Sequence, residues 1–124
     1  MADYPPAFDH MLAAWNEHDP GKIRGHLERG LTPDIHFVDP SIETRGLDEF
    51  EANVREFRSR LPDVRCLRSS GVDNHHNLFR YHWEIRRGDE LVLAGFDVVE
   101  VDDSNAVSRV LGFFGPVPPV SPAG

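Results

Sequence analysis

The stretch LFRYHWEIRRGDELVLAGFDVVEV, residues 78–101, decides the fold class because apolar residues alternate along two runs that a short turn separates. The pattern predicts a β-hairpin with a two-residue turn, formed either by Gly88 with Asp89 or by Arg87 with Gly88. Successive side chains of a strand point to opposite faces of its sheet. One face of the first strand would therefore carry Phe79, Tyr81, Trp83 and Ile85. The other face would carry Arg80, His82, Glu84 and Arg86.

Both turn registers place odd-numbered residues of the second strand on the face of the even-numbered residues of the first. Asp97 should then share a face with Arg80 and His82. The second strand is apolar on both faces, so we expect Asp97 to be buried and hydrogen-bonded to Arg80 or His82. Asp97 is either half of a structural ion pair with Arg80 or part of a functional site, and the residues leave both possibilities open.

Upstream of the hairpin, the apolar residues follow a helical spacing that predicts three helices. The first ends near Trp15, the second begins after Asp19 as N-cap and stops at Gly30, and the third follows Gly46. Strands are predicted over residues 35–39, 64–72, 78–87, 91–101 and 107–114. Helices followed by a run of strands indicate the α+β class. We predict one domain over residues 1–115 and an irregular, Pro-rich tail over 116–124.

Composition narrows the function classes. The 124-residue chain has the length of one domain, and its net charge of −8 opposes nucleic acid binding. No apolar run approaches the ~20 residues needed to span a bilayer, so we expect no contact with a membrane. The opening residues MADYPPAF lack the basic and apolar regions of a signal peptide, which favours a cytoplasmic location. His75 and His76 lie in a predicted turn with no third ligand at a suitable spacing, so we predict no metal site.

Residues 36–46, HFVDPSIETRG, place Asp39 between an apolar strand and a loop that Pro40 opens and Gly46 closes. An Asp-Pro pair often forms a turn in which the carboxylate accepts hydrogen bonds from nearby backbone amides. Alternatively, a strand that ends at the opening of a pocket would deliver Asp39 as a general base. We expect Asp39 to point into a pocket, whereas a solvent-facing carboxylate bonded only to the amides of Ile42 or Glu43 would identify a turn residue.

Several motifs, taken in their order, resemble one protein family. They are AAWNEHD at the end of the first helix, FVDP followed by a loop to Gly46, a third helix, LAGFDVVEVD and the closing VSRVLGFFG. Over roughly residues 8–115 the chain is similar to the SnoaL-like and ketosteroid-isomerase-like members of the nuclear transport factor 2 (NTF2-like) superfamily. The resemblance implies an α+β, cone-shaped roll in which three N-terminal helices pack on a strongly curved, mainly antiparallel sheet. It also implies an apolar pocket and frequent dimers.

The resemblance further implies roles for single residues. In ketosteroid isomerases one Asp moves the proton while a Tyr and a protonated Asp hold the oxyanion. Asp39 matches the first Asp, Asp97 matches the second, and Met11 stands at the tyrosine position. Limonene-epoxide-hydrolase-like proteins share the fold and use an Asp, Arg, Asp trio. Arg80 matches their arginine, His82 replaces one Asp, and the other Asp falls near Gly112.

We therefore predict a small-molecule enzyme that needs no cofactor and performs an isomerisation, cyclisation or dehydration on an apolar carbonyl compound. Asp39 is the predicted base, and Asp97, His82 and Arg80 form the polar wall. The predicted pocket lining is Met11, Trp15, Phe57, Leu93, Val99 and Phe113. The alternatives are a non-catalytic ligand-binding or dimer-scaffold module and an epoxide-hydrolase-like hydrolase. We expect a homodimer through the face of Phe79, Tyr81, Trp83 and Ile85, because so large an apolar face would not stay in water.

Overall fold

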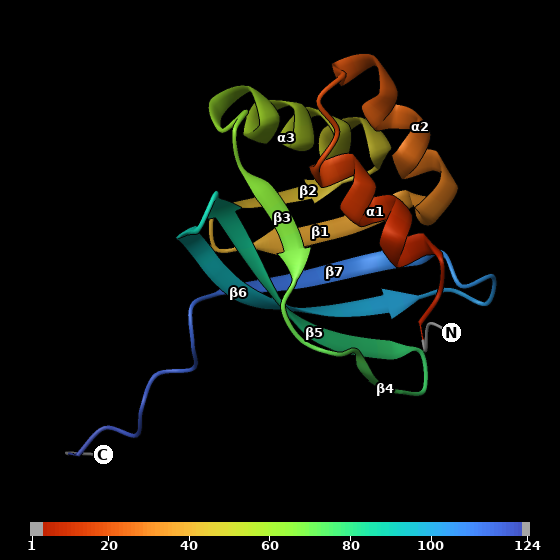
Figure 1. Cartoon of the computed structure of the whole chain (residues 1–124). Helices are drawn as coiled ribbons and strands as arrows, with labels where there is room; N and C mark the ends of the chain where they lie inside the picture. The colour runs from red at the N-terminus through yellow and green to blue at the C-terminus, as the bar shows by residue number, and fades with distance from the viewer. Residues whose placement is uncertain (1–3, 123–124) are drawn as a thin grey trace.

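Three helices lie against one face of a curved sheet in the computed structural model, which describes residues 4–122 (Figure 1). The helices are α1 (Ala7–Trp15), α2 (Pro20–Gly30) and α3 (Leu47–Arg60). The strands are β1 (Leu31–Asp39), β2 (Ile42–Arg45), β3 (Arg65–Arg68), β4 (Asp73–His75), β5 (Leu78–Arg87), β6 (Glu90–Val101) and β7 (Val107–Phe114).

The sheet is open, with the strand order β2-β1-β7-β6-β5-β3, and β4 pairs with β5 beside this path. Among the described pairs, β1 and β7 run parallel and the others run antiparallel. The parallel pair brings the end of β1 beside the middle of the chain's last strand. The predicted α+β fold with three N-terminal helices on a curved, mainly antiparallel sheet is confirmed.

Helix boundaries follow local sequence signals. Asp19 caps α2 by accepting a hydrogen bond from the backbone N–H of Gly21 at 2.9 Å, and Pro20 occupies the first helical position. In α3, acidic residues in the first turn and arginines in the last turn oppose the helix dipole. Of these arginines, Arg58 is buried and donates to the backbone oxygens of Val64 and Pro62 at 3.0 and 3.1 Å. It therefore fixes the loop from α3 to β3.

Two short strands, β2 and β4, were not predicted from the sequence, and two predicted strands have different bounds in the structure. Strand β2 pairs with β1 through a tight connection in which Asp39 stands opposite Ile42. Strand β4 has three exposed residues and no apolar alternation to reveal it. Strand β1 begins earlier than expected, at Leu31. Strand β3 ends earlier than expected, at Arg68, after which the hydroxyl of Ser70 accepts a hydrogen bond from the His82 backbone N–H at 2.8 Å.

The β5–β6 hairpin contains a β-bulge that the sequence analysis missed. Its turn matches the first of the two predicted registers, and next to it Arg86 pairs with Leu91. The next pair is Ile85 with Leu93, so Val92 is an extra residue in β6. One extra residue sends every later side chain of the strand to the opposite face. The predicted relation between the faces of β5 and β6 is therefore wrong beyond Val92.

As a result, Asp97 stands directly opposite Tyr81 and not on the face of the basic residues of β5. Phe79 and Tyr81 are buried, with 8% and 7% of their surface exposed, and both rings contact Phe8 of α1. The apolar face of β5 thus packs against the helices. The predicted dimer contact through Phe79, Tyr81, Trp83 and Ile85 is wrong for this reason, while the homodimer itself stays a prediction.

The core fills the space between the helices and the sheet. Its largest fully buried side chains are Phe8, Phe50, Ile23, Leu27, Ile35, Val54, Val99, Val107 and Val110. After Gly115 the chain leaves the domain and runs without helix or strand to residue 122 (Figure 1). Residues 123–124 of the predicted tail lie outside the described residues. Within residues 4–122, no helix combines the length and the apolar character needed to cross a bilayer.

Candidate functional site

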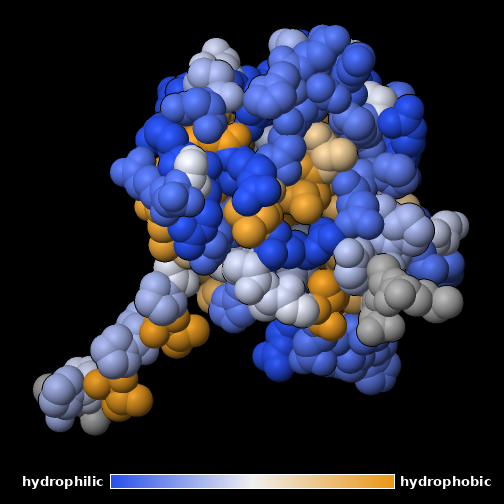
Figure 2. Space-filling model, in the orientation of Figure 1, coloured by the Kyte–Doolittle hydropathy of each residue, from blue (hydrophilic) through white to orange (hydrophobic). Residues whose placement is uncertain are grey.

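An apolar cavity of about 300 Å³ lies between the helices and the inner face of the sheet. Figure 2 shows apolar side chains near the middle of the face that Figure 1 presents, surrounded by hydrophilic ones. Of the predicted lining residues, Met11, Trp15, Phe57 and Leu93 border the cavity. Val99 lies in the closed core instead. Phe113, with 51% of its surface exposed, lies on the outer face of the sheet because its partner across β6 is Phe96.

Asp39 lies at the end of β1 and borders the cavity, and it is also part of a turn. Its Oδ1 accepts hydrogen bonds from the backbone N–H and the hydroxyl of Ser41 at 2.7 and 2.6 Å. A third bond comes from the backbone N–H of Ile42 at 3.1 Å. None of the hydrogen bonds formed within residues 4–122 uses Oδ2. The turn therefore holds one carboxylate oxygen in place, and Asp39 is at once a turn residue and a residue of the cavity border.

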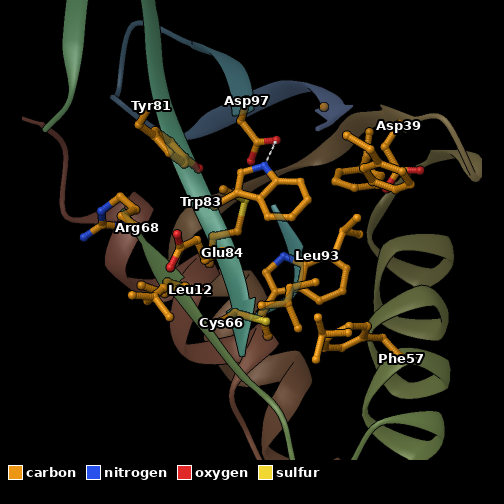
Figure 3. A pocket seen from close by; sticks show the side chains of 18 of the residues that line it. Leu12, Asp39, Phe57, Cys66, Arg68, Tyr81, Trp83, Glu84, Leu93 and Asp97 are labelled. Carbon is orange, nitrogen blue, oxygen red and sulfur yellow. Dashed lines mark hydrogen bonds between the residues drawn. The ribbon is translucent and has the colours of Figure 1, made fainter. Parts of the chain in front are cut away.

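Asp97 projects into the same cavity from β6 (Figure 3). The indole Nε1 of Trp83 donates a hydrogen bond to Asp97 Oδ1 at 2.9 Å. Burial raises the pKa of Asp97 to about 7, an effect that the negative charge of Asp39 reinforces and that the hydrogen bonds from Trp83 and Tyr81 oppose. At neutral pH the carboxyl group therefore divides between its protonated and ionised forms.

Gly112 of β7 separates the two carboxyl groups. It pairs with Asp97, and the parallel pairing of β1 with β7 brings Asp39 to its other side. A methyl group at this position would lie 3.0 Å from Asp97 Oδ1 and 3.2 Å from Asp39 Cβ. The absence of a side chain at Gly112 thus allows carboxyl groups from two different strands to border one end of the cavity.

Arg80 and His82, the other predicted catalytic residues, do not reach the cavity. Arg80 lies on the outer face of the sheet and bonds to Asp73 at 2.9 Å. The His82 side chain is exposed, and its ring lies beside Phe96 on the same outer face. Their predicted contact with Asp97 is wrong because the bulge at Val92 changes the register. The epoxide-hydrolase-like alternative is weakened for the same reason, because Arg80, which matches the arginine of those proteins, lies outside the cavity.

Tyr81 is a polar cavity residue that the sequence analysis did not include. It stands opposite Asp97, and burial raises its pKa well above the usual value, with the charge of Asp97 adding to the effect. Its hydroxyl is therefore a hydrogen-bond donor across the neutral pH range. Met11 lines the cavity but supplies no hydroxyl, so Tyr81 offers one from another element. Tyr81 was visible in the alternating pattern of the sequence, but the predicted register of the β5–β6 hairpin placed its side chain on the outer face of the sheet.

Leu12, Cys66 and Phe57 lie at the end of the cavity away from Asp97 (Figure 3). The side chain of Asn16 bonds to the backbone N–H and C=O of Cys66 at 2.7 and 2.8 Å, which ties β3 to the end of α1. Burial raises the pKa of the Cys66 thiol to about 11, so it is not a thiolate nucleophile at neutral pH. Within residues 4–122 no three His, Cys, Asp or Glu side chains are grouped as metal ligands.

A family model described as a SnoaL-like domain matches residues 8–109. A solved structure of a candidate isomerase of the SnoaL-like family, from Agrobacterium tumefaciens strain C58, is 27% identical with a TM-score of 0.82, over 89% of this chain and 95% of that chain. An NTF2-like protein of unknown function from Exiguobacterium sp. 255-15 is 14% identical, with a TM-score of 0.72 over 90% of this chain and 99% of that one. A SnoaL-like protein of unknown function from Burkholderia thailandensis E264 is 18% identical, with a TM-score of 0.67 over 88% and 92%. No curated protein matches the sequence significantly.

Proposed function

The chain belongs to the SnoaL-like domain family, and we propose that it is a small-molecule enzyme that performs acid–base chemistry on an apolar carbonyl compound without a cofactor. The observation that carries the proposal is the pair of carboxyl groups, Asp39 and Asp97, on either side of Gly112 in an apolar cavity. Two carboxyl groups in different environments are a common arrangement for a base and an acid in one site. A cytoplasmic location is part of the proposal, to be tested by cell fractionation.

In this proposal Asp39 is the base. Its Oδ1 is held by Ser41 and Ile42, which fixes the carboxylate at the edge of the cavity and leaves Oδ2 without a hydrogen bond among residues 4–122. Asp97 is the acid, because a pKa of about 7 leaves a large fraction of the group protonated at neutral pH. The Tyr81 hydroxyl supports this role because it donates to the Asp97 carboxylate and so stabilises the ionised form that remains after proton transfer.

Proton transfer then runs from the substrate carbon next to the carbonyl to Asp39, and from Asp97 to the carbonyl oxygen. The product of this step is a neutral enol, and the total charge of the site is unchanged. Within the described residues no unpaired basic side chain borders the cavity to stabilise an enolate, which favours proton donation by Asp97 in the same step. In both outcomes the enol O–H then returns its proton to Asp97. Delivery of the Asp39 proton to another carbon of a conjugated enol gives an isomerisation, whereas its delivery to a neighbouring hydroxyl group, which leaves as water, gives a dehydration.

Deuterium exchange tests the base without knowledge of the natural substrate. The protein is incubated in D2O with 2-tetralone, an apolar bicyclic ketone, and deuterium beside the carbonyl is followed by NMR. We expect exchange above the buffer rate, and a loss of at least ~100-fold in Asp39→Asn, the lower limit of what a general base supplies. Asp34→Asn, an exposed carboxylate of the same strand, is the control for the change in charge. Equal exchange by Asp39→Asn and wild type would contradict the assignment.

A non-catalytic ligand-binding module is the second candidate. The three turn hydrogen bonds of Asp39 favour it, because they give this carboxylate a structural role without chemistry. A binding module would retain a co-purified apolar compound, which mass spectrometry would identify. It would not accelerate deuterium exchange in any carbonyl compound. Exchange that depends on Asp39 distinguishes the enzyme from the module.

A further inference from the structure

The charges around the cavity are mostly negative. Four charged side chains border it, namely Asp39, Arg68, Glu84 and Asp97. Three of the four are acidic. Which of these charges a ligand meets depends on the partners that each side chain already has.

Arg68, the basic member, is already occupied. Its Nη2 donates to the carboxylate of Asp9 and to the hydroxyl of Tyr4, the latter at 2.6 Å, and its guanidinium lies 4.5 Å from the centre of the Tyr4 ring. Glu84 is also partnered, since Arg86 donates to its Oε1 at 2.7 Å. Two of the four charges are therefore balanced by neighbours and contribute little to the attraction of a ligand.

Asp39 and Asp97 have no basic partner among residues 4–122. Asp39 accepts hydrogen bonds from the backbone amides of Ser41 and Ile42 and from the Ser41 hydroxyl. Asp97 accepts from the indole N–H of Trp83 and from the Tyr81 hydroxyl. All of these groups are neutral. The end of the cavity beside Gly112 is therefore a place where negative charge lacks a counterion.

Aromatic rings surround the rest of the cavity. They are Phe8, Trp15, Phe37, Phe57, Tyr81, Trp83 and Phe114. The faces of such rings carry partial negative charge and attract cations, most strongly where water is excluded. An organic ammonium group between two carboxyl groups would thus find favourable electrostatics and an apolar wall for its hydrocarbon part.

We propose that the cavity binds apolar amines, with the protonated nitrogen at Asp39 and Asp97, and rejects anions of the same shape. The inference rests on the proposed function only in its use of the same two carboxyl groups, and such an amine would compete with a carbonyl substrate. A free carboxylate, a phosphate ester or a coenzyme A thioester is excluded as a ligand of this end of the cavity by the same charges.

Three matched probes test the proposal. They share a naphthalene ring and differ in the polar end: 2-(1-naphthyl)ethylamine is a cation, 2-(1-naphthyl)ethanol is neutral and 1-naphthaleneacetate is a carboxylate anion. Calorimetry on the full chain at pH 7.5 should give at least ~10-fold tighter binding of the amine than of the alcohol, and at least ~100-fold tighter binding than of the carboxylate. These ratios correspond to one and two charge-assisted interactions of moderate strength.

The variants locate the effect. Asp39→Asn and Asp97→Asn should each reduce the preference for amine over alcohol by at least ~3-fold, while the control Asp34→Asn retains it. Binding of the carboxylate within 10-fold of the amine, or no saturable amine binding up to 1 mM, would overturn the proposal. Deuterium exchange is measured separately, so a failed amine preference with intact exchange rejects this inference alone. Amine preference without exchange rejects the proposed function and leaves the inference standing.

Discussion

The two faces of the sheet carry their charges in opposite ways. On the outer face, Arg80 bonds to Asp73 at 2.9 Å, and both side chains are well exposed to water. On the inner face, Asp97 is largely removed from water and borders another carboxyl group without a basic partner. Exposed pairs contribute little to stability, whereas burial of an unpaired carboxylate is unfavourable. The exposed charges are therefore paired although the pair adds little stability, whereas the buried carboxyl group, whose ionised form a partner would stabilise most, has no basic partner. This distribution is typical of a functional site and not of a structural one.

The largest expected effect concerns Asp97→Asn. Because its pKa in the folded state is raised to about 7, from an ordinary value near 4, protonated Asp97 stabilises the fold below pH ~4. This contribution is lost as the pH rises through 7. Asn cannot ionise and can still accept the Trp83 hydrogen bond, so at pH 8 the variant should be more stable than wild type by up to about 4 kcal/mol.

Denaturant unfolding at pH 5 and pH 8 measures this difference. The gain from Asp97→Asn should be largest at pH 8 and fall to roughly a third of that value at pH 5, because the unfolded chain is already mostly ionised at this position at pH 5. Asp73→Asn is the matched control on the outer face and should change the free energy of unfolding by less than about 1 kcal/mol at both values. A destabilised Asp97→Asn at pH 8 would mean that a cation pairs with Asp97, and the contrast between the faces would disappear.

The second prediction concerns the backbone that supports the inner face. A methyl group at Gly95 would lie 2.1 Å from the Phe113 backbone oxygen and 2.4 Å from the Trp83 ring, so the indole that donates to Asp97 must shift. Gly95→Ala should destabilise the fold by about 1–3 kcal/mol. Gly71→Ala, with no atom within 4 Å of the added methyl, is the control. Thermal unfolding of both variants tests this, and equal melting temperatures would show that the indole does not depend on Gly95.

The third prediction moves the expected homodimer to the outer face. Phe96 and Phe113 stack there with ring centres 4.9 Å apart, and Phe113 is half exposed. If the chain self-associates as predicted, Phe113→Glu should weaken the dimer by at least ~10-fold, because a charge would replace an apolar contact. Sedimentation at micromolar concentrations measures the change. A wild-type monomer, or a dimer that tolerates the charge, would contradict this position.

The smallest effects are expected for Arg80→Ala and His82→Ala. Both side chains lie on the outer face, and the ion pair of Arg80 is exposed to water. Each variant should change stability by less than about 0.5 kcal/mol and should leave deuterium exchange of 2-tetralone unchanged. A large loss of deuterium exchange in either variant would contradict the position of these residues outside the site.

Local patterns predicted the fold because they depend on neighbours in the sequence. The apolar stripe of α3 and the alternation of β5 needed no knowledge of the rest of the chain. The faces of the β5–β6 hairpin failed because a bulge depends on packing across the sheet. Gly95, inside an otherwise apolar strand, was a signal that could have suggested such an irregularity.

The candidate site was predictable in part. Asp39 and Asp97 were identified from their places at a strand end and within an apolar strand, and both border the cavity. Tyr81 was assigned to the outer face because the register error reversed its direction. The burial of Arg58 had no sequence signal, since its partners are backbone oxygens of a loop whose path is set by tertiary contacts.

The extra residue in β6 also makes the chemistry of the cavity sensitive to a single deletion. Deletion of the single codon for Val92 would restore a regular hairpin and reverse the strand from Leu93 to Val101 in one event. Asp97 would then point into water, while Phe96 and Val98 would take its place inside. A lineage could thus gain or discard an acidic cavity without one amino-acid substitution. Two relatives with nearly the same residues in this strand could then differ in chemistry by the position of a single alignment gap.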